Sequence, residues 1–185
     1  MKITSASVAA LMLCLATPAL AKERSGVQFP DTATVEGKTL TLNGVGLRTK
    51  AIFKVYVAGL YTETASRDAA KVIGTDEVKR VRMHMLRDLE KAKIVDAIRD
   101  GFEKNNKAQF AALKTRLDRF VSVIPDLKKG DELLLTYAPG KGTTISSKSG
   151  QTLSVAGKDF ADALFSVWLG ANPVDEDLRD EMLGR

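Results

Sequence analysis

The residues best suited to chemistry lie in one stretch, residues 42–61, where a single arginine and two tyrosines stand among glycines and apolar residues. A guanidinium carries a fixed fork of donors that matches a carboxylate in two hydrogen bonds. Held against an apolar wall, such a fork makes an anion site. Arg48 is therefore the main candidate for ligand binding, although an edge-strand arginine with its head in water is the alternative for this residue taken alone.

Tyr56 is the natural partner of Arg48, because a phenol can donate a further hydrogen bond to the same anion. In one straight strand the Cα atoms of the two residues would be about 26 Å apart, at roughly 3.3 Å per residue. The chain must therefore reverse or bend sharply near residues 49–52 for the two side chains to meet. Tyr61 falls on the opposite strand face from Tyr56, where core packing is expected.

Other candidate chemistry is sparse in this chain. His84 is the sole histidine, and no His-x-x-Glu pattern accompanies it, so no metal site is predicted. The glycines of residues 140–144 lack the first glycine of a phosphate-binding loop, and no Gly-x-Ser-x-Gly is present. We therefore predict neither a cofactor nor a metal. The polar strand face of Arg80, Arg82 and His84 leaves a protein-interaction module open.

Residues 1–21 have the pattern of a secretory signal peptide. Lys2 gives a positive start, an apolar run is centred on residues 8–15, and the small residues Ala19 and Ala21 end it. Polar residues interrupt the run, which argues against a membrane span. We expect cleavage after Ala21, a periplasmic location, and a mature chain without a transmembrane segment.

The only cysteine, Cys14, lies within that apolar run. A lipoprotein anchor needs a small residue before its cysteine, whereas Leu13 precedes this one, so a soluble product is expected. The mature chain then has no thiol, which excludes disulfides and cysteine metal sites. The 28 basic and 23 acidic residues are interspersed. This mixing argues against nucleic-acid binding, and nothing in the pattern sets the oligomeric state.

The elements that must position these residues run in the order strands, helices, strands, which indicates an α+β fold in one domain, residues 22–185. From Phe53, odd positions are expected on one strand face, and Lys54, Tyr56 and Ala58 on the other. A helix over residues 66–73 is expected to begin at a Ser66 cap. The other expected strands are 33–42, 79–86, 132–137, 143–147 and 152–155, and the other expected helices are centred on 89–102, 110–124, 160–168 and 178–182.

Four segments of the chain share their order and spacing with a known family: Gly46–Arg48, Lys54–Tyr61, Leu86–Asp88 and Phe165–Pro173. Together they resemble the chalcone isomerase-like family, in its bacterial exported branch, over nearly all of the mature chain. The resemblance implies an open-faced β-sandwich, in which helices cover one face of a large antiparallel sheet and a ligand cleft lies between them. The element order predicted above agrees with that fold.

The resemblance implies one of two activities. Plant enzymes of the family close a chalcone into a flavanone, using an arginine together with a threonine and a tyrosine, whereas non-catalytic relatives bind fatty acids. Arg48 matches the family arginine. Tyr56 stands where the enzymes carry their threonine, which is similar to the fatty-acid-binding relatives, and the enzymes' catalytic tyrosine has no counterpart between Met83 and Phe102.

The leading hypothesis is thus an exported, non-catalytic protein that binds a fatty acid or a similar small amphipathic carboxylate. Arg48 and Tyr56 are expected to hold the carboxylate, and the cleft to bury the tail. The alternatives are an isomerase of the intramolecular lyase kind, with Arg48 stabilising enolate charge, and a protein-interaction module. The candidates to line the cleft are Met83, Met85, Phe102, Phe165 and Trp168, and core packing is the alternative for each of them taken singly.

Overall fold

The computed structural model describes residues 21–148 and 151–185. The predicted signal peptide, residues 1–21, lies outside the described residues except for Ala21, which opens the first strand, and residues 149–150, between the expected strands 143–147 and 152–155, also lie outside them. In the described part, no helix is long and apolar enough to cross a membrane. A small hairpin of β1 (Ala21–Arg24) and β2 (Val27–Pro30) precedes the main sheet.

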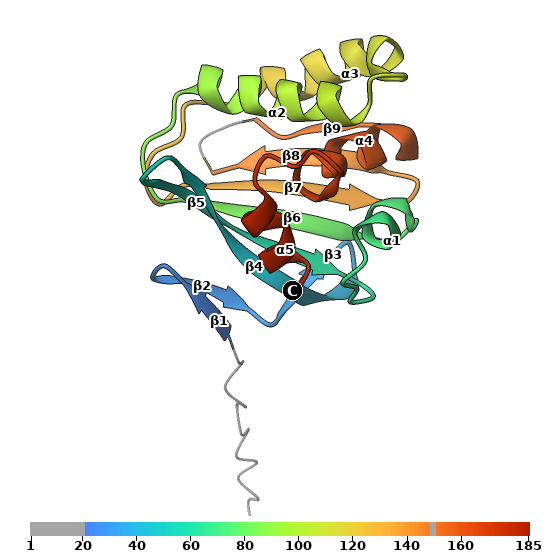
Figure 1. Cartoon of the computed structure of the whole chain (residues 1–185). Helices are drawn as coiled ribbons and strands as arrows, with labels where there is room; N and C mark the ends of the chain where they lie inside the picture. The colour runs from blue at the N-terminus through green and yellow to red at the C-terminus, as the bar shows by residue number, and fades with distance from the viewer. Residues whose placement is uncertain (1–20, 149–150) are drawn as a thin grey trace, which may run out of the picture.

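The main sheet has seven strands, and each strand pairs antiparallel with the next one in the chain. Each strand therefore lies beside its neighbours in the chain. The two long connections between strands carry three of the helices, and the other two helices follow the last strand (Figure 1). The predicted α+β class is confirmed. The strands are β3 (Thr32–Val35), β4 (Lys38–Lys50), β5 (Phe53–Thr62), β6 (Lys79–Met85), β7 (Glu132–Ala138), β8 (Gly142–Ser147) and β9 (Leu153–Val155).

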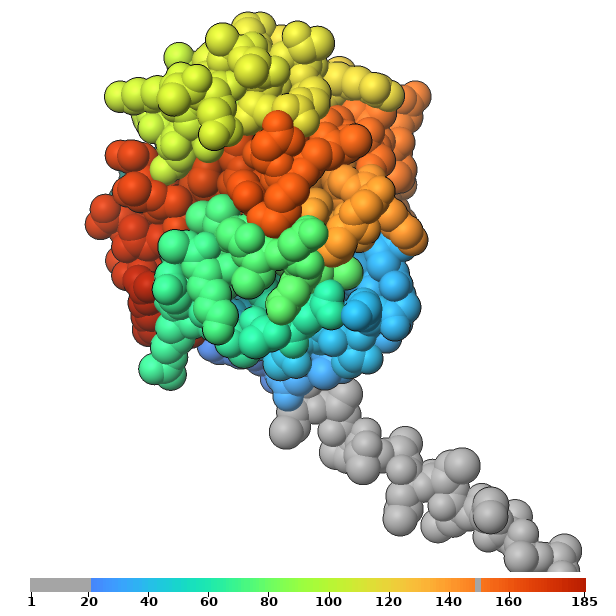
Figure 2. Space-filling model, turned by 90° about the vertical axis from the view of Figure 1, so that its right-hand side faces the viewer, coloured from blue at the N-terminus to red at the C-terminus, as the bar shows by residue number. Residues whose placement is uncertain are grey.

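Helices cover one face of this sheet. Figure 2 shows α2 and α3 at the top of the molecule, α4 below them and α1 lower still, so that they form a continuous layer on this side. The helices are α1 (Ala69–Gly74), α2 (Lys91–Asn105), α3 (Phe110–Ser122), α4 (Lys158–Leu169) and α5 (Glu176–Met182).

The C-terminal helix α5 packs directly on β4, which explains the glycines of that strand. A Cβ atom at Gly44 would collide with the backbone of Glu181 and Met182, and one at Gly46 would collide with Leu178. Only glycine lets the two backbones approach so closely. This packing places the start of α5 beside Arg48, which is two residues beyond Gly46.

The apolar side chains form two cores, one on each face of the sheet. The larger core fills the space between sheet and helices and includes Met85, Phe120 and Phe160. The smaller core lies under the β1–β2 hairpin and includes Phe29 and Tyr61. As expected, Tyr61 is buried on the face opposite Tyr56, and its hydroxyl donates to the carbonyl of Pro30 at 3.0 Å.

Helix α1 begins later than the sequence indicated. Asp68, rather than Ser66, is its N-cap, and the Asp68 carboxylate accepts hydrogen bonds from the backbone N–H groups of Ala70 and Lys71. Ser66 is bound elsewhere, because its own N–H donates to the Asn43 side chain at 2.7 Å. The predicted Ser66 cap is therefore wrong: a tertiary contact holds that residue outside the helix.

Candidate ligand-binding site

The hairpin of β4 and β5 brings Arg48 and Tyr56 together. The chain reverses in a two-residue turn at Ala51 and Ile52, and Arg48 and Tyr56 become direct partners across the two strands. Ala51 has a φ of 54°, the left-handed conformation that tight hairpin turns need. The chain thus makes the reversal near residues 49–52 that Arg48 and Tyr56 need in order to meet.

A β-bulge next to this pair changes which side chains face the helices. Arg48 pairs with Tyr56, but Thr49 pairs with Lys54, so Val55 is an extra residue on its strand. Val55 consequently packs against the main core together with Tyr56. The expected strict alternation, with Val55 and Tyr56 on opposite faces, is wrong at this point because the bulge turns Val55 towards the helices.

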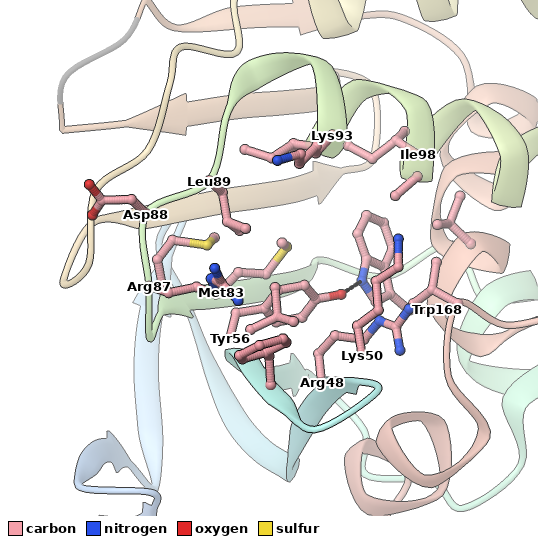
Figure 3. A pocket seen from close by; sticks show the side chains of 17 residues that line it. Arg48, Lys50, Tyr56, Met83, Arg87, Asp88, Leu89, Lys93, Ile98 and Trp168 are labelled. Atoms are coloured by element: carbon pink, nitrogen blue, oxygen red, sulfur yellow. Dashed lines mark hydrogen bonds between the residues drawn. The ribbon is translucent and has the colours of Figure 1, made fainter.

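A pocket of about 300 Å³ opens beside these residues, between the sheet and the helices α2 and α4 (Figure 3). Strands β5 and β6 supply its floor, and one face of α2 supplies its roof. Most of its wall is apolar, which suits a hydrocarbon ligand. The apolar lining residues are Phe53, Val55, Met83, Met85, Leu89, Ile94, Ala97, Ile98, Val167 and Val174.

Five of the seven residues that the sequence singled out line this pocket: Arg48, Tyr56, Met83, Met85 and Trp168. The other two were expected in the lining and lie elsewhere. Phe102 is fully buried, with its ring 5.8 Å from that of Phe160 in the interface of the helices. Phe165 is also buried, and its ring faces Lys79 near α1. Both rings fill core space because their helical positions point away from the cavity.

Arg48 keeps part of its guanidinium available to a ligand. Its Nη1 donates to the carbonyl of Thr49 at 2.6 Å and to Oδ2 of Asp175 at 2.8 Å. Asp175 is also the N-cap of α5, since its Oδ1 accepts from the N–H of Leu178. Among the described residues, Nε and Nη2 of Arg48 have no hydrogen-bond partner. These two nitrogens form the edge that binds a carboxylate in two hydrogen bonds.

Tyr56 lies across the strand pair from Arg48, and Trp168 holds its hydroxyl in place. The indole Nε1–H donates to the Tyr56 hydroxyl oxygen at 3.1 Å, as Figure 3 shows. The phenol is 8% exposed, and burial raises its pKa to about 12. It therefore stays protonated at neutral pH, and its own O–H has no acceptor among the described residues. Tyr56 can donate one hydrogen bond to an anion, but it cannot act as a base.

Three further cations surround the mouth of the pocket, namely Lys50, Arg87 and Lys93. The acid at the mouth, Asp88, points away from the cavity in Figure 3 and is bound by Lys128 and by the N–H of Lys129. The mouth is therefore positively charged. Arg87 lies in one of the segments that carry the family resemblance, whereas sequence reasoning missed the two lysines, because surface lysines carry no distinguishing pattern.

The polar strand face is used within the fold. Arg82 donates to Glu132 and lies over the ring of Phe29, at 4.8 Å from its centroid. Arg80 donates to Thr136, and His84 contacts Glu132 at 3.3 Å. Arg82 and His84 thus share Glu132, and Arg82 also contacts the β1–β2 hairpin. In residues 21–148 and 151–185, no group of three His, Cys, Asp or Glu side chains is arranged to hold a metal ion.

Comparison with known proteins agrees with this architecture. The family model described as chalcone isomerase-like matches residues 21–184, and no curated protein matches the chain. Among solved structures, the crystal structure of the Arabidopsis thaliana fatty-acid binding protein AtFAP1 has a TM-score of 0.65 at 18% identity, with 89% of this chain and 96% of that chain covered. That likeness shows the fold. Because the family model spans nearly every described residue, the chain belongs to the chalcone isomerase-like family.

Proposed function

We propose that this protein binds a fatty acid, or a similar small amphipathic carboxylate, in the pocket and leaves it chemically unchanged. The observation that carries the proposal is that Arg48, with two unpartnered donors, and its cross-strand partner Tyr56, with a free O–H, line the same apolar cavity. A carboxylate accepts from both groups at once, and a hydrocarbon tail has the apolar wall to cover it.

The size and charge of the pocket support the same ligand class. Its volume of about 300 Å³ is at the lower end of the range for small-molecule sites. The cations at the mouth favour an anionic head group. The similarity of fold to AtFAP1, a fatty-acid binding protein, is consistent with this assignment.

The same groups favour holding over catalysis. Tyr56 keeps its proton, because burial raises its pKa to about 12, and the carboxylate of Asp175 is occupied by Arg48 and by the cap of α5. Neither group is placed to move protons at neutral pH. Arg48 could still stabilise a developing enolate, as an intramolecular lyase requires, so the experiment includes a chalcone substrate.

The fluorescence of Trp168 reports on ligand binding, because this residue is the only tryptophan of the chain and lies in the pocket wall. The mature chain, residues 22–185, is titrated with hexadecanoate and, separately, with hexadecanol, while the fluorescence of Trp168 is followed. We expect saturable binding of the acid and much weaker binding of the alcohol. The Arg48→Met variant should weaken acid binding about tenfold to a hundredfold, since a hydrogen bond to a charged group is worth about 1.5–3 kcal/mol.

Arg119→Met is the matched control, because Arg119 is an exposed arginine of α3 outside the pocket lining. It should leave the affinity unchanged. If the wild-type chain binds no fatty acid, or if Arg48→Met and Arg119→Met behave alike, the proposed site is wrong. Cyclisation of a hydroxychalcone well above its spontaneous rate would show an isomerase instead.

We further propose that residues 1–21 direct export to the periplasm, on the basis of the positive start, apolar run and small-residue end of that segment. Fractionation of cells that make the full chain should recover a periplasmic protein that begins at Lys22 by mass. A full-length protein in the cytosol, or one retained in the membrane, would contradict this assignment.

A further inference from the structure

The turn of the β4–β5 hairpin carries an unusual exposed surface. Among the residues that the structure describes, two large apolar side chains are exposed, Ile52 at 86% and Phe53 at 54%. They are adjacent in the chain and lie at the turn. The hairpin turn lies at the edge of the molecule, beside the loop from β6 to α2 (Figure 1). Exposed residues of this kind that gather at one projecting tip indicate a contact surface.

Cations surround this apolar tip. Lys50 and Lys54 flank the turn and are exposed, and the guanidinium of Arg87 stacks on the Phe53 ring at 4.9 Å from its centroid. The acids of the neighbouring loop are already paired, Asp88 with Lys128 and Glu90 with Lys93. The tip therefore combines two apolar side chains with three cations that form no ion pair within the described residues.

We propose that this tip docks the protein on the surface of an anionic phospholipid bilayer. Apolar side chains that enter the boundary of the acyl region, together with cations that meet lipid phosphates, are the combination by which peripheral proteins attach to membranes. The tip is too small for a stable protein interface, which buries more than about 1,000 Å² in total. A bilayer surface, in contrast, needs only a few anchoring side chains.

The position of the tip connects the docking with transfer of the ligand, and this step rests on the proposed function. Lys50, Phe53 and Arg87 belong both to the tip and to the lining of the pocket. When the tip lies on a bilayer, the pocket mouth meets the membrane surface. A fatty acid can then move between bilayer and pocket without exposing its tail to water, which is the main cost of its transfer.

Vesicle flotation of the mature chain tests the docking. The vesicles contain either phosphatidylcholine alone or phosphatidylcholine mixed with phosphatidylglycerol. The variants are Ile52→Asp and Lys54→Glu, because neither residue lines the pocket and both are exposed. The wild-type chain should float with the anionic vesicles only, and each variant should reduce the bound fraction at least about fivefold. Their affinity for hexadecanoate in solution should stay unchanged.

Lys71→Glu is the control for charge alone, because Lys71 is an exposed lysine of α1, at the other end of the molecule (Figure 1). It should float as the wild type does. Absence of wild-type binding to anionic vesicles, full binding by Ile52→Asp, or an equal loss with Lys71→Glu overturns the docking. If the chain binds vesicles but no fatty acid, the docking stands and the proposed ligand is refuted. If it binds fatty acid but no vesicles, the proposed ligand stands and the docking is refuted.

Discussion

At the scale of single residues, the site depends on which N–H donors of Arg48 are bound within the protein and which remain free for a ligand. One nitrogen, Nη1, is bound to the carbonyl of Thr49 and to Asp175, and this holds the guanidinium plane in place. The opposite edge remains for a ligand. Both carboxylates, that of Asp175 and that of the ligand, would then share one cation, so Asp175 positions Arg48 and at the same time weakens its attraction for a second anion.

Asp175→Asn tests which of these effects is larger. Asparagine caps a helix as well as aspartate does, so the bond to the N–H of Leu178 is retained while the negative charge is lost. We expect hexadecanoate to bind about fivefold more tightly, since relief of charge repulsion should exceed the loss of positioning by about 1 kcal/mol. The Trp168 titration measures it. Asp177→Asn, an exposed acid on the same helix, should have no effect, and weaker binding by Asp175→Asn would show that positioning dominates.

Tyr56→Phe removes one donor to the ligand while the ring stays in place. Hexadecanoate affinity should fall about tenfold to a hundredfold, because a hydrogen bond to a charged carboxylate is worth about 1.5–3 kcal/mol. Tyr61→Phe is the control, because that hydroxyl donates to Pro30 on the other face of the sheet. Equal affinities for the wild type and Tyr56→Phe would remove Tyr56 from the site.

Tyr56→Phe should also change how the stability of the protein depends on pH. Burial raises the pKa of Tyr56 to about 12 in the folded protein, against about 10 for an exposed tyrosine. The folded chain therefore holds this proton at pH values where the unfolded chain has lost it. The stability that Tyr56 contributes should be complete below pH 10 and should decline as pH rises towards 12. Urea unfolding at pH 9 and pH 11 should show a smaller decline for Tyr56→Phe than for the wild type.

At the scale of elements, a buried lysine ties α1 to the sheet. Lys79 on β6 is 2% exposed, and its ammonium donates to the carbonyls of Val72, Ile73 and Thr75 at the end of α1, at 2.5, 2.8 and 2.8 Å. Burial lowers its pKa to about 8, so it is still charged at pH 7. The lysine thereby satisfies carbonyls that the short helix leaves without partners.

Lys79→Met should lower the free energy of unfolding by about 2–4 kcal/mol at pH 7, because it leaves buried carbonyls unsatisfied. Chemical denaturation followed by circular dichroism measures the change. Lys71→Met, an exposed lysine on α1 itself, should change stability by less than about 0.5 kcal/mol. A small effect at Lys79 would mean that water replaces the ammonium at those carbonyls.

Most elements were predictable, because alternation and helical periodicity are local properties of the chain. The features that were missed are set by contacts distant in sequence. Asn43 holds Ser66 outside α1, so the cap moves to Asp68. The bulge that turns Val55 inward depends on the pairing of β4 with β5. Candidate site residues could be picked by type and by family resemblance, but the role of Asp175 required knowing that α5 packs on β4.

The residues that line the pocket were even harder to predict from the sequence. Periodicity places Phe102 on an apolar helix face, and it is buried there as expected. Whether a buried residue borders a cavity or fills the core depends on how neighbouring helices pack, and the ring of Phe160 takes up the space beside Phe102. Met83 and Met85 reach the pocket because they lie on β6 beneath α2, a relation that no local pattern contains.

At the scale of the whole molecule, one sheet serves two separate cores. The helix face carries the pocket, and the opposite face is closed by the β1–β2 hairpin, with Phe29 as its main anchor. A Cβ atom at Gly59 would collide with the Phe29 ring, so the ring packs directly on the strand backbone. This division allows the hairpin face to stabilise the sheet without contributing any side chain to the ligand site.

Phe29→Ala tests the separation of the two faces. The side chain is fully buried, so its loss should lower the free energy of unfolding by about 3–5 kcal/mol. Ile52→Ala is the control, since that side chain is 86% exposed and should cost almost nothing. Because Phe29 lies across the sheet from the pocket, the folded fraction of Phe29→Ala should bind hexadecanoate with wild-type affinity. A more than threefold change in that affinity would show that packing under the β1–β2 hairpin is transmitted through the sheet to Arg48 and Tyr56.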